Sequence, residues 1–274
     1  MTVVPLVDIG ANLAHDSFDA DRDAVLARAR RAGLVHVVVT GSSLASTAAA
    51  IGLARAHPGF LSATAGVHPH HALELGDEAL ATLAGQLRAP EVVAAGECGL
   101  DYFRDYSPRH AQRAAFERQL ALAVTTRKPL FLHQRDAHAD FLAMLRAAGT
   151  GLPRAVAHCF TGSRAEAEDY LALGLHIGIT GWICDERRGQ HLAEVVRIVP
   201  AGRLMLETDA PYLLPRTLKP RPTSRRNEPF HLTEVCRAVA AARAESVEDT
   251  ARATTRTAAA FFGLKIPVPD LEIA

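Results

Sequence analysis

Three side chains that could hold a metal ion stand at the ends of short apolar runs in the sequence. Glu97 follows the run VVAAG, His133 ends the run PLFLH, and His158 ends the run RAVAH. Two imidazoles and one carboxylate form a nitrogen and oxygen ligand set that leaves positions on the metal open for water and substrate. A metal ion held in this way lowers the pKa of its bound water and polarises the group that the water attacks. These residue types therefore predict metal-assisted hydrolysis.

Four more polar residues follow or end other apolar runs. Asp8 ends PLVD, His68 and His70 follow LSATAGV, and Asp209 follows LMLET. A single histidine at the end of a strand is usually only hydrogen-bonded or solvated, so each of these residues is weak evidence on its own. Together with Glu97, they predict a shared site if the fold brings the ends of these runs together.

The elements that must position these residues are short apolar runs that alternate with amphipathic helical stretches. Most runs are continuous in hydrophobicity rather than alternating, as expected of parallel strands that are buried on both faces. The predicted strands are Leu6–Ile9, Val35–Thr40, Leu61–Ala65, Val92–Gly96, Leu130–His133, Ala155–His158, His176–Thr180 and Arg203–Glu207. The predicted helices are Asp21–Ala32, Leu44–Ala56, Glu78–Leu87, Arg109–Thr126, Ala139–Ala148, Arg164–Leu173, Gln190–Val199, Pro229–Ala242 and Val247–Phe262.

Signals at two helix starts support these bounds. Ser107 before Pro108 is a favourable pair for the N-cap and the first helical position. Ser163, with Glu166 three residues later, predicts a capping box.

The number of strand–helix units indicates the fold class. Eight units in 274 residues predict one α/β domain over residues 1–274, folded as a closed (β/α)₈ TIM barrel. A doubly wound open sheet is the alternative, but no glycine-rich phosphate fingerprint follows the first strand. In a closed barrel the carboxyl ends of the strands meet at one mouth, where active sites lie. The barrel would therefore bring the candidate ligands together.

The net charge excludes a protein that is coated with basic residues. Lys and Arg together number 30, as do Asp and Glu, and the net charge is +0. A polyanion must therefore bind to a local patch. The candidate patch is the Pro- and Arg-rich loop Leu214–Pro229 between the last strand and its helix. Loops on this side of a TIM barrel commonly bind phosphate.

The cysteine pattern and the hydropathy predict a cytoplasmic protein. The four cysteines are scattered and form no CxxC pair, which favours free thiols in a reducing compartment. In the start MTVVPLVDIG, Asp8 interrupts the apolar run too soon for a signal peptide. No apolar run reaches the ~20 residues that span a bilayer. We therefore expect no membrane partner, and we expect a monomer.

A series of motifs resembles the TatD nuclease family. The motifs are GVHPHH (66–71), AAGECGLDY (94–102), FLHQRDAH (131–138), AHCFTG (157–162), IGITGWICDERRG (177–189), LETDAPYLLPR (206–216) and SRRNEP (224–229). Their order and spacing hold from about Val7 to Gly263, and the series is far more specific than any single motif. The DIGANL and GWICDERRG segments are most similar to bacterial members of the family that act as 3′–5′ exonucleases.

The resemblance implies roles for the candidate residues. Glu97, His133 and His158 match the family's metal ligands, and Asp209 matches the carboxylate that orients or deprotonates the attacking water. General chemistry agrees, because a carboxylate near a metal-bound water can accept its proton. The alternative role for Asp209 is to cap the loop before Pro211.

The resemblance also implies that the predicted (β/α)₈ TIM barrel is of the metallo-dependent hydrolase type, with a divalent metal ion as cofactor. The family implies Mg²⁺ as the activating ion, whereas imidazole ligands suit Zn²⁺ or Mn²⁺ better, so the sequence leaves the identity of the ion open. The family commonly begins with an Asp-x-His-x-His strand, but this sequence has Asp8, Gly10 and Asn12 at those positions. We therefore expect one ion to be held firmly by the three later ligands, and a second ion to arrive only with substrate or at high concentration.

Candidate substrate contacts are basic and aromatic residues near the expected mouth. Arg135 follows the fifth strand and could bind a phosphate, as could Arg225 and Arg226 in the loop after the last strand. His68 and His70 either touch the leaving phosphate or shape a Pro-containing turn. The aromatic candidates for stacking on bases are Tyr102, Trp182 and Tyr212.

Three functions are consistent with the sequence. The first is a metal-dependent phosphodiesterase, a 3′–5′ exonuclease that degrades single-stranded DNA or RNA in DNA repair or nucleic-acid turnover. The second is an amidohydrolase-like enzyme that cleaves a C–N or ester bond with the same metal-activated water, and a small apolar pocket without convergent arginines would favour it. The third is a non-catalytic nucleic-acid-binding barrel, which would still bind after loss of the metal or of Glu97. The basic loop favours the first function.

Overall fold

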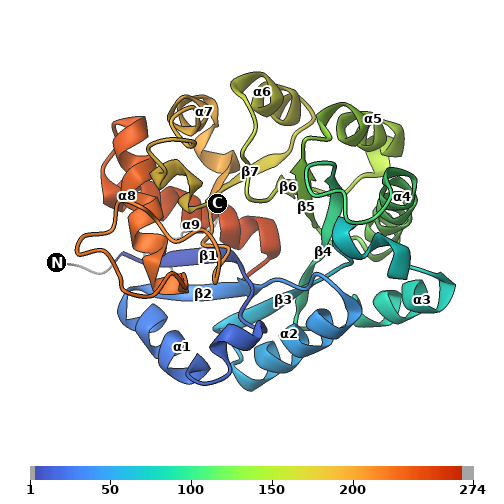
Figure 1. Cartoon of the computed structure of the whole chain (residues 1–274), viewed down its shortest axis with the longest axis horizontal. Helices are drawn as coiled ribbons and strands as arrows, with labels where there is room; N and C mark the ends of the chain where they lie inside the picture. Colours follow the sequence, from blue (N-terminus) through green and yellow to red (C-terminus); the bar gives the residue numbers. More distant parts are fainter. Residues whose placement is uncertain (1–3, 267–274) are drawn as a thin grey trace.

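Eight parallel strands form the centre of the molecule in the computed structural model (Figure 1). The structure describes residues 4–266, so both ends of the predicted 1–274 domain lie outside the described residues. The strands follow one another around the sheet in sequence order. Helices lie around the outside of the ring of strands (Figure 1). The predicted TIM barrel is therefore confirmed.

The helices and strands agree closely with the predicted ones. The strands are β1 (Leu6–Ala11), β2 (Leu34–Val39), β3 (Leu61–Ala65), β4 (Val92–Asp101), β5 (Leu130–Arg135), β6 (Ala155–Ala157), β7 (His176–Ile179) and β8 (Leu204–Leu206). The α-helices within residues 4–266 are α1 (Arg22–Arg31), α2 (Leu44–Ala56), α3 (Asp77–Gln86), α4 (Arg109–Thr126), α5 (His138–Ala148), α6 (Arg164–Ala172), α7 (Leu192–Ile198), α8 (Leu232–Arg243) and α9 (Val247–Phe262). None of these helices is both long and apolar enough to cross a membrane. The largest difference is in β4, which runs on to Asp101 instead of ending at Gly96, so Glu97 lies within the strand.

Large apolar side chains fill the inside of the barrel. Ile9 of β1, Val38 of β2 and Phe131 of β5 are completely buried and belong to one cluster. Phe261 of α9 joins this cluster and packs edge-on against His176 at the start of β7. Helix α9 therefore covers the amino-terminal end of the barrel, and the carboxyl ends of the strands form the opposite end.

The barrel closes where the residues after β8 meet β1. Asp209 N donates to Gly10 O (2.8 Å), and Asn12 N donates to Ala210 O (2.7 Å). These backbone hydrogen bonds bring Asp209 and Asn12 together at the carboxyl-terminal end of the barrel.

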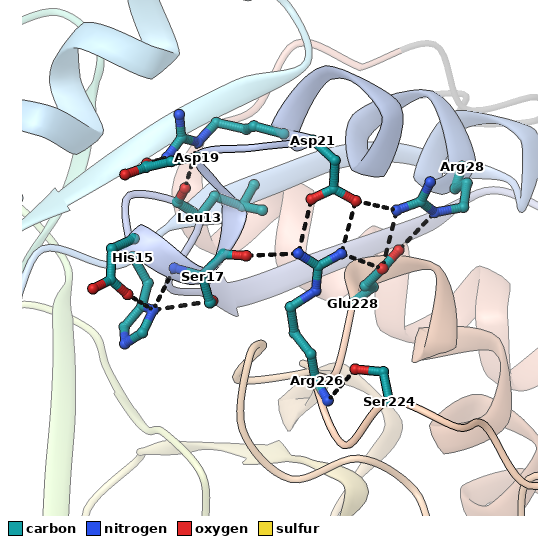
Figure 2. Close-up of polar contacts among 11 residues, drawn as sticks. Leu13, His15, Ser17, Asp19, Asp21, Arg28, Ser224, Arg226 and Glu228 are labelled. Atoms are coloured by element: carbon teal, nitrogen blue, oxygen red, sulfur yellow. Dashed lines mark hydrogen bonds and ion pairs between the residues drawn. The ribbon is translucent and has the colours of Figure 1, made fainter.

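An ion-pair network ties the loop after β8 to α1 (Figure 2). Arg226 donates to both carboxylate oxygens of Asp21 (2.8 Å each) and to Glu228 (2.9 Å). Arg28 of α1 donates to Glu228 (2.7 and 3.0 Å) and to Asp21 (3.1 Å). Each guanidinium thus contacts both carboxylates. We call this network of Asp21, Arg28, Arg226 and Glu228 the loop clasp, because it fastens one end of the predicted loop Leu214–Pro229.

The two predicted helix starts have different outcomes. Ser163 caps α6 in a capping box with Glu166, as predicted. The prediction for Ser107 is wrong, because Pro108 holds the N-cap position of α4. The Ser107 hydroxyl donates instead to the carbonyl oxygen of His70 (2.9 Å). Ser107 therefore joins the loop after β4 to the loop after β3.

Candidate metal centre and active site

The candidate site is a pocket at the carboxyl ends of the strands. The pocket has a volume of about 480 Å³, and we call it the mouth pocket. It is lined by Asn12, Ser42, His68, His70, His71, Glu97, Asp101, Arg104, His133, Arg135, His158, Cys159, Trp182, Asp209, Tyr212 and Leu213. A larger cavity of about 830 Å³ lies between α4 and α5 on the outside of the barrel, but its lining includes none of the predicted site residues. We therefore place the chemistry in the mouth pocket.

One oxygen of Glu97 lies among three imidazoles. Glu97 Oε1 is 3.0 Å from His133 Nδ1, 3.4 Å from His158 Nε2 and 3.5 Å from His68 Nε2. The structure thus brings together the three residues predicted as metal ligands and adds His68 to them. Burial by itself raises the pKa of Glu97, but the neighbouring imidazoles hold it well below its usual value. Glu97 is therefore a carboxylate at neutral pH.

The donor atoms around Glu97 fit a divalent cation. His133 Nε2 is buried and makes no hydrogen bond within residues 4–266, and it lies 3.4 Å from Asp101 Oδ2. Within residues 4–266, two groups of side chains each offer potential ligand atoms that lie within 4.8 Å of one another. The first group is His68, Glu97 and His133, and the second is His158, Cys159 and Asp209. Buried carboxylates and ring nitrogens without partners are costly unless a cation or a proton satisfies them. The cluster is therefore suited to metal binding.

The position of Glu97 depends on two glycines in the segment GECG. Gly96 and Gly99 have φ angles of +138° and +145°, which side chains rarely adopt. A Cβ on Gly96 would collide with the carbonyl oxygen of Phe131, and a Cβ on Gly99 with that of His133. These glycines let β4 approach β5 closely, and the approach sets Glu97 beside His133.

Asp101 is a site residue that the sequence analysis missed. Its carboxylate is almost completely buried, accepts two backbone N–H bonds (3.0 and 2.8 Å), and lies 2.8 Å from His70 Nε2. Burial raises the pKa of Asp101, but contacts with His133 and His70 lower it well below the usual range. The sequence signal that could have identified Asp101 was its position four residues after Glu97. Residues i, i+2 and i+4 of a strand lie on the same face, so a longer strand would place both carboxylates there. The predicted strand ended too early to use this signal.

Glu207 is a second missed residue. It is fully buried, its Oε2 lies 2.5 Å from His158 Nδ1, and its Oε1 accepts a hydrogen bond from Cys159 N (2.5 Å). A proton on Nδ1 that points at Glu207 leaves Nε2 of His158 to face Glu97, as in carboxylate–histidine–metal triads. Burial lowers the pKa of His158, but Glu207 and Glu97 raise it well above its usual value. The sequence signal that could have identified Glu207 was its position in LETD, two residues before the candidate Asp209.

Two glycines make room for the Glu207 carboxylate. A Cβ on Gly10 of β1 would come within 2.8 Å of Glu207 Oε2 and 3.4 Å of His158 Nδ1. A Cβ on Gly178 of β7 would collide with Glu207 Oε1. Gly10 is one of the two positions that depart from the Asp-x-His-x-His pattern. The Glu207–His158 pair therefore lies against the backbone of Gly10, the position at which the Asp-x-His-x-His pattern has its first histidine.

Asp209 lies in the mouth pocket and contacts Asn12. Asn12 Nδ2 donates to Asp209 Oδ1 (2.9 Å), and no other hydrogen bond to the Asp209 side chain is formed within residues 4–266. The side chain therefore does not cap the loop before Pro211. Burial raises the pKa of Asp209 to about 7, although His158 and the hydrogen bond from Asn12 oppose the shift, and Glu97 and Glu207 add to the rise. A carboxylate with such a pKa can accept a proton from water.

Asp8 does not line the mouth pocket, so its predicted place there is wrong. Strand β1 runs on to Ala11, and the Asp8 carboxylate is completely buried. Its oxygens accept hydrogen bonds from Thr208 N (3.0 Å), Thr208 Oγ1 (2.5 Å) and Gly10 N (3.2 Å). Burial raises the pKa of Asp8 to about 8. Asp8 joins β1 to the segment after β8.

His68 and His70 line the mouth pocket and also shape a turn. His68 Nδ1 accepts a hydrogen bond from His70 N (3.1 Å) at the start of the 3₁₀ turn η2 (Pro69–Glu74). The His68 ring lies 4.2 Å from the His70 ring and 4.4 Å from the His133 ring, between centroids. Burial lowers the pKa of His68 to about 3, so the ring is neutral at pH 7. The turn-shaping role is present, and contact with a phosphate stays a prediction.

The basic residues divide into those that line the pocket and those that do not. Arg135 lines it, with its guanidinium 4.3 Å from the ring centroid of Phe103. Arg104, which the sequence analysis missed, also lines it. Arg225 is exposed and Arg226 is held in the loop clasp, and neither belongs to the lining. The structure therefore does not bring these two predicted contacts to the mouth pocket.

Of the three aromatic candidates, two line the mouth pocket and one does not. Trp182 and Tyr212 line the mouth pocket. Tyr102 does not, because its hydroxyl donates to Asp140 of α5 (2.7 Å) and an arginine, Arg109, covers its ring. Only two of the three can therefore meet a base in this pocket.

Known proteins of one family match this chain along almost its whole length. Residues 7–263 match the family described as TatD related DNase. A curated protein of Erwinia amylovora, named 3′–5′ ssDNA/RNA exonuclease TatD, is 51% identical over 259 residues, which cover 94% of this chain and 100% of that protein. The solved structure of a TatD family hydrolase from Entamoeba histolytica has a TM-score of 0.87 at 27% identity and covers 96% of this chain and 99% of its own. A TatD homologue from Escherichia coli K12 has a TM-score of 0.86 at 30% identity, with coverages of 94% and 98%. The chain therefore belongs to the TatD related DNase family.

Proposed function

We propose that this protein is a metal-dependent 3′–5′ exonuclease that degrades single-stranded DNA or RNA. The observation that carries the proposal is the mouth pocket, where Glu97 lies among three imidazoles and Arg135 lines the same hollow. A guanidinium pairs well with a phosphate and has no charged partner on a neutral C–N or ester substrate. The name of the Erwinia amylovora relative supports the same activity.

Glu97, His133 and His158 would hold one divalent ion in the mouth pocket. The buried Nε2 of His133, which lacks a hydrogen-bond partner within residues 4–266, supports this ligand set. When bound, a divalent ion lowers the pKa of a coordinated water and polarises a phosphoryl oxygen. The family resemblance favours Mg²⁺, whereas the imidazoles favour Zn²⁺ or Mn²⁺.

We expect metal analysis of the dialysed protein to find one ion. The reason is that Gly10 and Asn12 replace the two histidines that would complete a second site, which therefore lacks two imidazole ligands. Two ions at near-full occupancy without substrate, seen by anomalous diffraction, would contradict this expectation.

The other residues of the pocket would orient the substrate and the attacking water. Asp209, whose carboxylate Asn12 holds through a hydrogen bond of 2.9 Å, is placed to accept the proton of the water. Arg135 would bind a phosphate of the strand, and Tyr212, whose side chain is 51% exposed, would offer a surface to a base. The imidazoles of His133 and His158, which face Glu97 Oε1, keep Glu97 ionised.

Digestion of end-labelled oligonucleotides tests the proposal. A 5′-labelled single strand should shorten one nucleotide at a time, a 3′-labelled one should lose its label at once, and chelator should stop both reactions. Glu97→Ala should remove activity while the protein stays folded. Full activity in excess chelator would overturn the metal dependence, and binding without any hydrolysis would favour the non-catalytic barrel.

The form of the substrate is tested in the same assay. A flexible single strand can enter a pocket of about 480 Å³ that a stiff duplex cannot enter without melting. We expect blunt duplex to be degraded much more slowly than a single strand. Equal rates on both, or rapid nicking of a circular single strand, would exclude an enzyme that acts on single-stranded ends.

We also propose that the whole chain is one catalytic domain that works as a monomer in the cytoplasm. The support is that Cys98, Cys159, Cys184 and Cys236 are all free thiols in the structure, as expected in a reducing compartment. Light scattering on the purified protein would measure its oligomeric state, and a stable dimer would contradict this part of the proposal.

A further inference from the structure

A second, smaller cavity adjoins the mouth pocket. Its volume is about 190 Å³, and its lining shares Arg135 and Trp182 with the mouth pocket. Thr161, Arg188 and His191 belong to the rest of its lining. We call this hollow the side cavity. Since Arg135 and Trp182 belong to both linings, the side cavity lies directly beside the mouth pocket.

Two guanidiniums lie near the ring of Trp182 at this junction. Arg188 Cζ is 4.6 Å from the ring centroid, and Arg135 Cζ is 5.9 Å from it. The ring is carried by the 3₁₀ turn η4 (Gly181–Cys184) after β7 and is half-buried, so part of its surface is open to a ligand. Proteins that bind single strands combine aromatic rings, on which bases stack, with nearby arginines, which bind the phosphates.

Guanidiniums outnumber carboxylates around the side cavity. Arg188 and its neighbour Arg187 share the one carboxylate of Asp185, at 3.6 and 3.8 Å. Arg135 makes no ion pair within residues 4–266. Asp136 is the acidic side chain of the lining. The surplus positive charge favours an anionic ligand such as a phosphate.

We propose that the side cavity binds the nucleotide on the 5′ side of the scissile bond, in the part of the strand that remains after cleavage. Its base stacks on Trp182, and its phosphate contacts the guanidiniums of Arg135 and Arg188. This assignment rests on the proposed exonuclease function, because the 3′-terminal nucleotide in the mouth pocket is joined to a strand that must leave past the shared wall. The ligand of the side cavity is thus an oligonucleotide and not a free nucleotide.

Intrinsic fluorescence tests the binding directly, because the chain contains one tryptophan. Metal-free protein in chelator is titrated with thymidine 5′-monophosphate, with a thymidine dinucleotide and with a thymidine hexanucleotide. We expect both oligonucleotides to quench the fluorescence of Trp182, and the mononucleotide to quench it at least about tenfold less effectively, as expected for the loss of one stacked base. Equal quenching by all three ligands at equal concentration would overturn the proposal.

A matched pair of variants tests the phosphate contact. The side chains of Arg187 and Arg188 are 62% and 65% exposed and share Asp185, but only Arg188 lines the side cavity. R188A should weaken hexanucleotide binding about threefold to tenfold and lower the slope of log affinity against log salt by about 0.7, the value for one phosphate contact on a single strand. R187A should change neither quantity. Equal effects of the two substitutions would overturn the assignment of Arg188.

Kinetics separates this proposal from the proposed function. The two substrates are the hexanucleotide and the p-nitrophenyl ester of thymidine 5′-monophosphate, which has no nucleotide on the 5′ side of the scissile bond. In R188A, the ratio of kcat/KM for the hexanucleotide to kcat/KM for the ester should fall about threefold to tenfold. An unchanged ratio in an active enzyme would overturn the assignment of the side cavity as a nucleotide site. If the unmodified protein hydrolyses neither substrate, the proposed function fails. The fluorescence titration then still shows whether the side cavity binds an oligonucleotide.

Discussion

Both ring nitrogens of His158 face carboxylates, and these two contacts set the orientation of the ring. Nδ1 lies 2.5 Å from Glu207 Oε2, and Nε2 lies 3.4 Å from Glu97 Oε1. The contact with Glu207 selects the tautomer that leaves Nε2 for a metal ion. Glu207 is therefore a positioning residue, which acts on the metal site through His158.

Glu207→Gln is expected to lower metal affinity about 10- to 100-fold. Glu207 accepts from two donors, His158 Nδ1 and Cys159 N, and a glutamine offers only one acceptor oxygen, so one donor would face an amide group. Calorimetric titration with Mn²⁺ measures the affinity, and the ¹⁵N chemical shifts of His158 report the tautomer independently of activity.

The control for this change is Glu91→Gln. Glu91 precedes β4 at the opposite end of the barrel and pairs with Arg55 (2.8 Å), so its substitution should leave metal affinity unchanged. If the Glu207→Gln protein is folded and binds the metal as tightly as the unmodified protein, Glu207 has no positioning role.

Asp209→Asn should lower kcat about 100-fold or more while metal affinity changes much less. An asparagine can keep a hydrogen bond with Asn12, but it cannot accept the proton of the attacking water. Steady-state kinetics and metal titration on the same preparation measure the two effects. Losses of equal size in both quantities would make Asp209 a metal ligand instead of a base.

At the scale of elements, the carboxyl-terminal end of the loop after β8 is held to the barrel by two sets of contacts. Asn227 N donates to Pro211 O (2.9 Å), and Asn227 Nδ2 donates to Thr208 O (3.0 Å). The loop clasp adds the tie to α1 shown in Figure 2, and the hydrogen bond from Arg226 is the main reason that the pKa of Asp21 falls to about 2. These contacts present Tyr212 to the mouth pocket.

Arg226→Ala is expected to destabilise the protein by about 1–2 kcal/mol and to expose the loop to proteases. The change leaves Asp21 and Glu228 with Arg28 as their only partner in the clasp, and solvent screening limits the loss because the Asp21 side chain is 34% exposed. Urea unfolding and limited proteolysis measure the two effects. The exposed neighbour Arg225 is the control, and its change to alanine should leave both unaltered. Identical stability of the two variants would show that the clasp does not hold the loop.

At the scale of the whole molecule, a buried histidine links stability to pH far from the mouth pocket. His36 of β2 is 5% exposed, and its Nε2 lies 2.9 Å from Ser62 Oγ of β3. Burial lowers the pKa of His36 to about 4, although a contact with Gly59 opposes the shift. In the unfolded chain the histidine pKa is about 6.5. Between these values the unfolded chain binds more protons, so stability falls as the pH falls through this window.

We therefore expect His36 to contribute a loss of up to about 3 kcal/mol in the free energy of unfolding between pH 7 and pH 4. His36→Gln, which can keep the hydrogen bond to Ser62, should show a smaller decrease over the same range. Urea unfolding of both proteins at several pH values gives the difference. Parallel pH profiles would mean that His36 does not carry this dependence.

The strand–helix units and the meeting of the three candidate ligands could be predicted because their signals are local. A strand buried on both faces needs a continuous apolar run, and a helix on the barrel surface needs an apolar stripe, so each element can be recognised from a few consecutive residues. Once the fold class is known, the ends of the strands must meet. This geometry is enough to bring Glu97, His133 and His158 together.

The partners of those ligands were decided by the tertiary structure alone. Arg226 looked like a substrate contact in the sequence, but it pairs with Asp21, a residue 205 positions away. Asp8 bonds to Thr208, 200 positions away, and Glu207 reaches His158 because glycines on β1 and β7, the strands on either side of β8, leave space for its carboxylate. Each of these contacts depends on strand register and on the closure of β8 against β1. No local pattern encodes them, because hydrogen bonds and ion pairs need distances of a few ångströms that only the closed barrel provides.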